Sequence, residues 1–348
     1  MMIPIVMNTS FIKLAIIDDY ISFIWATRYY TCGEFELCVS VNENTTALYQ
    51  KGYYICRDDD LEHIGIIEKI RIEKLKDNQE RAIITGRFLS SILGRRIIAV
   101  QTQVSGQVGP CIQKLINENA IAPSISARTI PGLSFTSQVV SSLSMQAQFT
   151  GDNLLEAISS ICQTYGIGFK TLLDSNNHFS FVLFEGVNRS VAQAVNPHVI
   201  FSDEYDNLIS SEYEESHQEM VTDVLIAGEG EGLDRKTLWV TKTAPTGLAR
   251  YEFFQDARDA STNGGEIDET TYYNQLRGEA LESITTFTSA FAGEVDFANI
   301  KYGVDINIGD ICTIKNTRWG LSINTRLVEV IESVSESGAY TITPSFGI

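Results

Sequence analysis

Histidines and runs of acidic residues are the features of this sequence with the most potential for catalysis or metal binding. The four histidines are His63, His178, His198 and His217. None lies in an H-E-x-x-H motif, so the sequence offers no ligand set for a zinc hydrolase, and we expect each histidine on the surface or in a turn. Arg57-Asp58-Asp59-Asp60 is acidic enough to attract a cation. Oxygen-ligand cages, however, use alternating loop positions and a later carboxylate, so we predict a solvated turn and no metal site.

Signatures of phosphate binding and of nucleophilic catalysis are equally weak. Gly228-Glu229-Gly230-Glu231-Gly232 is rich in glycine, but its two carboxylates would repel a phosphate, and we expect a long hairpin loop. The sequence has no G-x-S-x-G elbow and no recognisable Cys/His signature. Acids are abundant and their spacing in three dimensions is unknown, so a paired-carboxylate hydrolase stays open. We therefore assign no catalytic residue and no cofactor, and interpret the chain as a non-enzyme.

The cysteine pattern indicates a protein of a reducing compartment. The six cysteines are Cys32, Cys38, Cys56, Cys111, Cys162 and Cys312. None forms a C-x-x-C pair, and most stand in apolar runs such as residues 311–314. We expect small buried apolar side chains, with neither a disulfide nor a zinc site.

Negative charge is concentrated in the last two fifths of the chain. The net charge is -18. Residues 1–200 hold 18 acids and 16 bases (a difference of -2), whereas residues 201–348 hold 26 acids and 10 bases (a difference of -16). Phosphate binding needs clustered Lys and Arg, so this distribution excludes a protein that grips nucleic acid. It fits a solvated acidic face, and also a surface that lets a polyanion pass without adhesion.

The first hundred residues show the period-two pattern of β-strands. We expect strands over 11–17, 20–30, 33–41, 52–56, 64–75 and 81–88. Asp18-Asp19 is suited to a hairpin turn between the first two, and residues 76–80 to a turn between the last two. The clearest alternation places Phe35, Leu37 and Val39 on one face of a half-buried strand. The prediction is an antiparallel meander that closes into a sheet or barrel.

The pattern changes to a helical period from about residue 104. A helix is expected over 110–120, with Pro110 in its first turn. Asn153 and Glu156 resemble a capping box that opens a second helix, which stops at Gly166. Strands over 168–173 and 179–184 complete what resembles a compact inserted α+β module.

Strands return after residue 197, with one helix over 269–284. The expected strands are 199–202, 219–227, 237–243, 250–254, 286–291, 302–308, 310–315, 326–333 and 339–343. The fold class predicted for the chain is therefore α+β and β-rich.

Several segments, in this order, resemble the siphophage tail-tip hub family, which is related in fold to the baseplate hub of contractile tails. The segments are 25–30 (WATRYY), 32–37 (CGEFEL), 65–68 (GIIE), 85–89 (TGRFL), 93–98 (LGRRII), 247–254 (GLARYEFF), 256–259 (DARD), 302–305 (YGVD), 308–310 (IGD) and 326–330 (RLVEV). The resemblance spans nearly the whole chain, and its specificity lies in the ordered set.

The resemblance implies a homotrimer in which each chain supplies two related tube-type β-barrel domains, so that three chains form a pseudo-sixfold ring. The implied division is a first barrel over 1–103, an α+β insertion over 104–196, and a second barrel with a peripheral helix over 197–348. Strands may be exchanged between the first and last regions. Some relatives continue into a lysin domain, whereas this sequence ends at residues 343–348, directly after its last expected strand, and we expect no such enzyme.

The implied location is the tail tip of a virion, reached after synthesis in the host cytoplasm without a signal peptide. Implied partners are further copies of the chain, the tail tube or distal tail protein, and tip or fibre proteins, with DNA passing through unbound. The structural or interface candidates are Trp25, Arg95, Arg96, Arg250, Gly309 and Asp310. Core packing for the tryptophan and a turn for the glycine are the plainer alternatives, and the arginine pair fits a surface as well as an interface.

Two alternatives from other classes stay open. One is a tail-associated cell-wall hydrolase. The other is a carbohydrate-binding receptor module, whose sign would be a cluster of exposed aromatic residues on one loop face, and the sequence shows none. No run of about 18 apolar residues occurs, so no membrane-spanning segment is expected.

Overall fold

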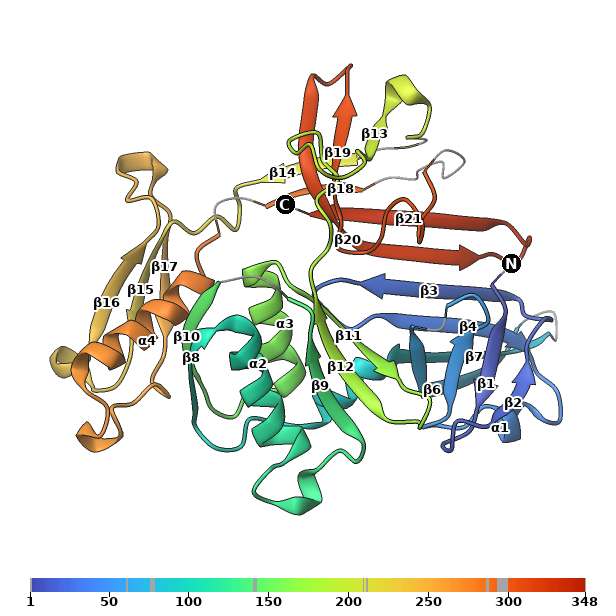
Figure 1. Ribbon diagram of the computed structural model, residues 1–348, viewed down its shortest axis with the longest axis horizontal. Helices are drawn as coiled ribbons and strands as arrows, with labels where there is room; N and C mark the ends of the chain where they lie inside the picture. The colour runs from blue at the N-terminus through green and yellow to red at the C-terminus, as the bar shows by residue number, and fades with distance from the viewer. Residues whose placement is uncertain are drawn as a thin grey trace.

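A large β-sheet runs through most of the molecule, and helices are few (Figure 1). The computed structural model describes residues 2–60, 62–75, 79–139, 143–208, 210, 212–285, 288–292 and 300–347. Within these ranges the largest sheet has 13 strands, and three smaller sheets have two, three and three. The predicted β-rich α+β class is confirmed.

The first part of the chain supplies seven strands of the large sheet, in the order β3-β4-β7-β6-β5-β1-β2. They are β1 (Pro4–Met7), β2 (Lys13–Ile16), β3 (Ser22–Arg28), β4 (Glu34–Ser40), β5 (Tyr54–Arg57), β6 (Ile64–Lys74) and β7 (Glu80–Phe88), with the one-turn helix α1 (Thr45–Leu48). The expected alternation in β4 is confirmed, since Phe35, Leu37 and Val39 are buried, and β6 pairs with β7 as predicted. The hairpin expected at Asp18-Asp19 is wrong. β2 pairs with β1, and β3 pairs with β4.

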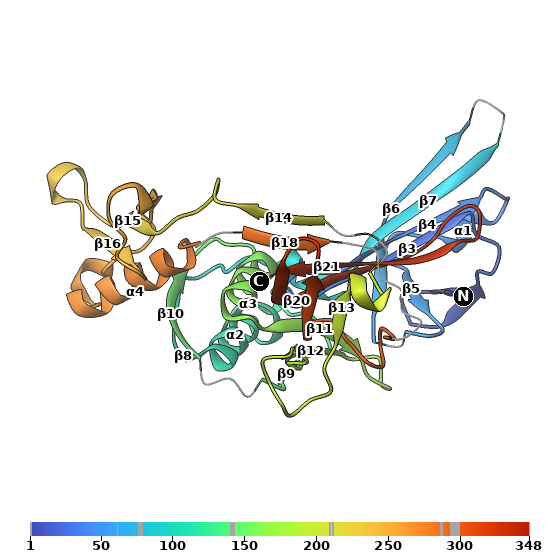
Figure 2. The ribbon, with the colours of Figure 1, turned by 90° about the horizontal axis from the view of Figure 1, so that it is seen from above.

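The last part of the chain extends the same sheet. Its strands are β13 (Ile200–Ser202), β14 (Glu212–Ser216), β18 (Thr288–Ala292), β19 (Ile311–Asn316), β20 (Leu321–Val334) and β21 (Tyr340–Gly347). β20 pairs antiparallel with β3, from Glu329 opposite Arg28 to Val334 opposite Phe23. The N-terminal and C-terminal strands therefore form one continuous sheet, visible as the blue and red arrows side by side in Figures 1 and 2. The strand expected over 302–308 is wrong, because that segment forms only an isolated bridge between Tyr302 and Ile306.

The middle of the chain forms an α+β module beneath this sheet (Figure 1). Its elements are η1 (Leu89–Arg95), β8 (Thr102–Gln107), α2 (Val108–Ile116), η2 (Asn117–Ile121), η3 (Ser126–Arg128), β9 (Leu133–Ser137), β10 (Ser144–Phe149), α3 (Leu154–Tyr165), β11 (Gly168–Leu173) and β12 (Phe179–Phe184). η1 and η3 are 3-10 helices, and η2 is a π-helix that continues α2. β8 pairs with β10, and β12 pairs with both β11 and β9. The sequence did not reveal β9 and β10.

The ends of α3 follow the predicted capping signals. The Asn153 side chain accepts hydrogen bonds from the backbone N–H groups of Leu155 and Glu156, which satisfies two donors that the helix leaves open. Gly166 ends the helix in the left-handed region with φ of +70°, a conformation that glycine adopts without strain. The first-turn position of Pro110 in α2 is confirmed as well.

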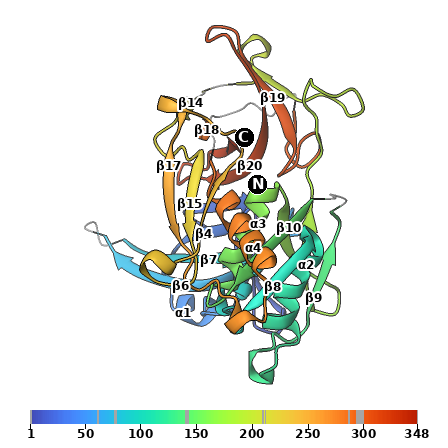
Figure 3. The same ribbon diagram turned by 90° about the vertical axis from the view of Figure 1, so that its left-hand side faces the viewer.

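A fourth part of the chain forms a small sheet of its own. Its elements are β15 (Asp223–Ala227), η5 (Gly232–Asp234), β16 (Thr237–Thr241), η6 (Gly247–Ala249), β17 (Glu252–Asp256), η7 (Asn263–Gly265) and α4 (Glu269–Glu282). The short 3-10 helix η4 (Asp203–Tyr205) lies before this unit in the chain. The strand order is β16-β15-β17, and α4 covers one face (Figures 1 and 3). Residues 228–236 form the predicted loop of the β15–β16 hairpin. This unit lies within the stretch assigned to the second barrel, and the division into domains stays a prediction.

The cysteines behave as small core residues. All six thiols are free, five are buried, and Cys32 is half-buried. Within the described ranges, no helix combines the length and the apolar character needed to cross a bilayer.

Candidate functional site

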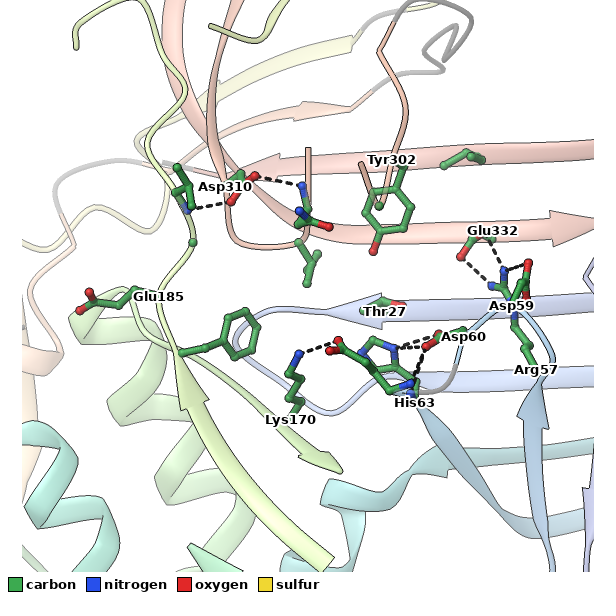
Figure 4. A pocket seen from close by; sticks show the side chains of 18 of the residues that line it. Thr27, Arg57, Asp59, Asp60, His63, Lys170, Glu185, Tyr302, Asp310 and Glu332 are labelled. Carbon is green, nitrogen blue, oxygen red and sulfur yellow. Dashed lines mark hydrogen bonds and ion pairs between the residues drawn. The ribbon is translucent and has the colours of Figure 1, made fainter. Parts of the chain in front are cut away.

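A cavity lies where the N-terminal strands, the inserted module and the C-terminal strands meet. Its volume is about 690 Å³, and its lining comes from β3, β5, β11, β12, β20 and β21 and the segments between them (Figure 4). Six acids face it: Asp59, Asp60, Glu62, Glu185, Asp310 and Glu332. Arg57, His63 and Lys170 are their basic counterparts. The chemistry of this junction depends on how these charges are paired.

Arg57 is a deeply buried cation at the junction. Its side chain is 4% exposed, and its guanidinium donates from Nη1 to Glu332 Oε2 at 2.6 Å and from Nε to Asp59 Oδ1 at 2.8 Å. Burial alone would lower the pKa of Arg57, but the hydrogen bonds to the two carboxylates raise it, so the group stays charged. Because Glu332 is on β20 and Arg57 ends β5, this pair links the two ends of the chain.

Asp60 organises a second cluster beside the first. It accepts hydrogen bonds from Trp25 Nε1 at 2.9 Å and from His63 Nδ1 at 2.9 Å. Burial would raise the pKa of Asp60, but the bonds from His63 and Trp25 hold it at about 2. The expected solvated turn is therefore wrong at this aspartate. His63 lies in the segment that turns from β5 to β6, which is one of the two positions expected for the histidines, with its side chain 16% exposed and its ring 5.3 Å from that of Phe88. His178, His198 and His217 are exposed, as predicted.

Asp310 binds the segment that follows β12, where the chain leaves the inserted module. Its carboxylate accepts from the backbone N–H of Val187 at 2.7 Å, from Arg189 Nε at 2.8 Å and from the backbone N–H of Asn307 at 3.0 Å. The side chain is 3% exposed. Asp310 therefore joins the connection after β12 to the loop before β19.

Three glycines form a tight socket around the fully buried Tyr29. A Cβ atom at Gly168 or Gly309 would overlap the Tyr29 ring, and one at Gly186 would overlap the Gly309 backbone. The Tyr29 hydroxyl donates to the carbonyl of Gly166 at 3.1 Å and accepts from the N–H of Gly186 at 3.2 Å. Gly309 also has φ of +91°, which excludes most other residues. Tyr29 therefore packs the end of β3 against the inserted module and the segment before the C-terminal strands.

This arrangement holds distant parts of the chain together through ion pairs and hydrogen bonds. The cations at the junction lie against carboxylates: Arg57 as described, and Lys170 on Glu62 at 2.5 Å. The Tyr340 hydroxyl donates to Glu332 Oε1 at 2.6 Å, which occupies that carboxylate further. Among the described residues, no group of three or more His, Cys, Asp or Glu side chains has an arrangement that could hold a metal ion.

The six residues singled out from the sequence fall in three places. Trp25 is fully buried and reaches the junction through its hydrogen bond to Asp60, Gly309 lies against the Tyr29 ring, and Asp310 lines the cavity. Arg95 and Arg96 lie at the end of η1, where Arg95 is exposed and Arg96 Nε donates to the carbonyl of Arg128 at 2.6 Å. Arg250 lies in the small sheet, where its Nη1 is 2.7 Å from Asp223 Oδ1.

Sequence reasoning missed three residues that hold the junction together. Tyr29 and Glu332 carry no local signal, because their partners are more than 130 positions away in the chain. Arg57 had one signal available, since it stands next to three acids at the end of an apolar strand. A charged side chain on a buried strand needs a partner of opposite charge, because burying it unpaired is energetically costly.

Comparison with known proteins shows which family the chain belongs to. A family model described as "Siphovirus ReqiPepy6 Gp37-like protein" matches residues 4–348. The chain belongs to this family. The predicted resemblance to siphophage tail proteins is thereby confirmed. No curated protein matches the chain in sequence.

Three of the solved structures similar to this family member are tail proteins. The tail protein of Neisseria meningitidis MC58 has a TM-score of 0.61 and 13% identity over 100% of this chain and 96% of its own. The 43 kDa tail protein of prophage MuSo2 from Shewanella oneidensis has a TM-score of 0.60 and 13% identity, covering 99% and 98%. Prophage tail protein gp18 from Listeria monocytogenes EGD-e has a TM-score of 0.56 and 11% identity, covering 99% and 94%. At these identities the likeness shows a shared fold.

Proposed function

We propose that the protein is a structural hub at the tail tip of a phage or tail-like particle. In this proposal three copies form a ring with pseudo-sixfold symmetry, because each copy supplies two β-rich regions. The ring joins the tail tube, or a distal tail protein, to tip or fibre proteins and surrounds the path of the DNA. The chain has no enzymatic role in it.

The observation that carries this proposal is the pairing of β3 with β20. It makes the strands from residues 4–88 and the strands β13, β14 and β18–β21 one continuous sheet, while the inserted module over 102–184 and the small β15–β17 sheet stay outside it. One chain thereby presents two strand sets side by side, which is what a threefold assembly needs to face a sixfold tube. The fold shared with tail proteins over nearly the whole chain supports the same assignment.

Charge and site chemistry support a passive conduit. The chain carries a net charge of -18, and β14 exposes three acids, Glu212, Glu214 and Glu215. A surface of this kind repels the phosphate backbone, so DNA would pass without adhesion. The charges of the cavity at the junction hold the chain together through ion pairs, which favours a structural role over a hydrolase.

Immunogold labelling of purified particles that contain the chain tests the proposal. We expect gold only at the distal end of the tail, at the junction between tube and tip. Label along the whole tube, or on the capsid, would contradict a hub.

A further inference from the structure

The part of the chain that holds the small β15–β17 sheet and α4 is attached to the large sheet by two neighbouring segments. The chain enters it through residues 217–222, after β14, and leaves it after Glu282, before β18, and β14 and β18 pair with each other. The two segments lie side by side, since the Val221 N–H donates to the carbonyl of Thr285 at 2.8 Å. Residues 223–282, called the small unit below, stand at one end of the molecule (Figures 1 and 2). Two adjacent connections form a hinge about which a unit can turn as a body.

The small unit also contacts the inserted module, where α4 packs on β10. A Cβ atom at Gly278 of α4 would come within 2.0 Å of the Gln146 carbonyl oxygen, so the two backbones approach closely there. Gln148 of β10 donates from Nε2 to the carbonyl of Asp259 at 3.2 Å. The hydrophobic cluster under α4 and the cluster of the inserted module have no described residue in common. Polar groups therefore carry much of this contact.

The face of α4 that meets β10 carries two glutamates. Four residues share this face, because they are spaced i, i+3, i+4 and i+7 along the helix: Gln275, Gly278, Glu279 and Glu282. The close approach of Gly278 identifies it as the face toward β10. Both glutamates are half-buried. A carboxylate in such a place has lost part of its water, and ionisation is costly unless a partner compensates for it.

The charges that act on Glu279 are acidic. They belong to Asp259, before α4, to Asp152, before α3, and to Glu282, one turn further along α4. β10 holds no charged residue. Arg277, the base of α4, is exposed and two positions from Glu279, which places it on the other side of the helix. Ionised glutamates at this boundary would therefore meet like charges.

Protonation removes this repulsion. Burial and the neighbouring acids raise the pKa of Glu279 to about 8, and burial raises the pKa of Glu282, whose charge acts on Tyr165 of α3, to about 7. Gln275 is 1% exposed, and its Oε1 accepts no hydrogen bond from the described part of the chain. Residues at i and i+4 are neighbours on a helix, so a protonated Glu279 carboxyl group can donate to this oxygen.

We propose that protonation of Glu279 and Glu282 holds the small unit on the inserted module, and that their ionisation releases it to turn about its two connections. The docked form keeps both carboxyl groups uncharged at the contact between α4 and β10, whereas the released form exposes them to water, where they ionise. Docking is present at low pH and is lost as the pH rises through about 7 to 8. The contact lies within one chain, so the inference stands whether or not the chain forms the proposed ring.

Hydrogen exchange followed by mass spectrometry tests the inference on the full-length chain, at about pH 6 and about pH 9, with labelling times corrected for the intrinsic exchange rate. The peptide that covers β10 reports on docking, and the peptide that covers α3 is the internal reference for the inserted module. The pKa of Glu279 is about 8 in the docked form and returns toward its ordinary value of 4.5 on release, so the released population should rise on the order of a hundredfold between these pH values. We expect the protection of β10 to fall by this factor and that of α3 to remain.

Two variants separate these glutamates from other groups. The double variant Glu279→Gln with Glu282→Gln cannot ionise at these positions, and it should keep β10 protected at both pH values. Glu269→Gln, which replaces an exposed glutamate in the first turn of the same helix, is the matched control and should show the same loss of protection as the wild type.

Other results would overturn the inference. Equal protection of β10 at both pH values, or a pH dependence that persists in the double variant, would show that these glutamates do not control docking. If α3 loses protection together with β10, the inserted module itself opens and the hinge is not involved. If calcium alone restores the protection of β10 at about pH 9, the carboxylates form a cation site in place of a proton-controlled contact.

Discussion

Replacing Glu332 by Gln tests whether the buried ion pair between Arg57 and Glu332 stabilises the fold more than an exposed ion pair does. The exchange keeps the shape of the side chain but leaves the buried Arg57 with Asp59, whose side chain is 47% exposed, as its remaining carboxylate partner. Breaking a buried ion pair costs about 3–5 kcal/mol, because a charge stays buried without its partner. Since Asp59 remains bonded, we expect a loss of about 3 kcal/mol in the free energy of unfolding.

Glu329 offers a matched control on the same strand. It pairs with Arg28 at 2.6 Å, but these side chains are 23% and 28% exposed. Arg28 also keeps Glu34, so Glu329→Gln should cost about 1 kcal/mol or less. A double variant, Arg57→Met with Glu332→Met, removes both buried charges and should recover most of the loss.

Urea denaturation followed by tryptophan fluorescence measures these differences. Trp25 is fully buried beside Arg57, at 5.9 Å from the guanidinium to the ring, so its emission reports on the junction. Equal losses for Glu332→Gln and Glu329→Gln would refute the argument, as would a double variant less stable than the single one.

Three further predictions concern packing, pH and capping. Gly168→Ala should lower the free energy of unfolding by about 1–3 kcal/mol, because the new methyl group overlaps the Tyr29 ring. Gly347→Ala, also on a strand, is the control, because its methyl group has room. Thermal melting compares the two variants, and equal losses of stability would argue against the tight packing around Tyr29. Burial raises the pKa of Glu279 to about 8, so the folded state binds a proton that the unfolded state releases above about pH 4.5. Stability is therefore lost as the pH rises from about 4.5 to about 8. Glu279→Gln should flatten this dependence in denaturation curves at pH 5 and pH 8, and an unchanged slope would contradict the assignment. Asn153→Ala removes the cap of α3 and should cost about 1 kcal/mol; a neutral effect in the same urea assay would show that the cap is not needed.

Local signals in the sequence predicted the local structure. The cap at Asn153 and the stop at Gly166 act within one helical turn, and the alternation of Phe35, Leu37 and Val39 reports a strand with one face buried. These features depend only on near neighbours in the chain. For that reason they could be predicted without knowing what packs against them.

Pairing between distant segments could not be predicted in the same way. A polar pair such as Asp18-Asp19 permits a hairpin between the strands on either side of it, but β2 joins β1 and β3 joins β4 and β20, and a turn signal carries no information on these partners. The junction depends on Arg57 meeting Glu332, 275 positions later in the chain. The sequence also gave no sign that Trp239 and Phe254 share one face of a sheet, because they do so only through β15, which lies between their strands.

The solution mass of the purified chain across a concentration series tests the central claim most directly. The account predicts a species at three times 38.7 kDa, or a monomer that moves toward that mass as the concentration rises. A chain that stays at 38.7 kDa at every concentration would contradict a ring that this protein builds from its own copies.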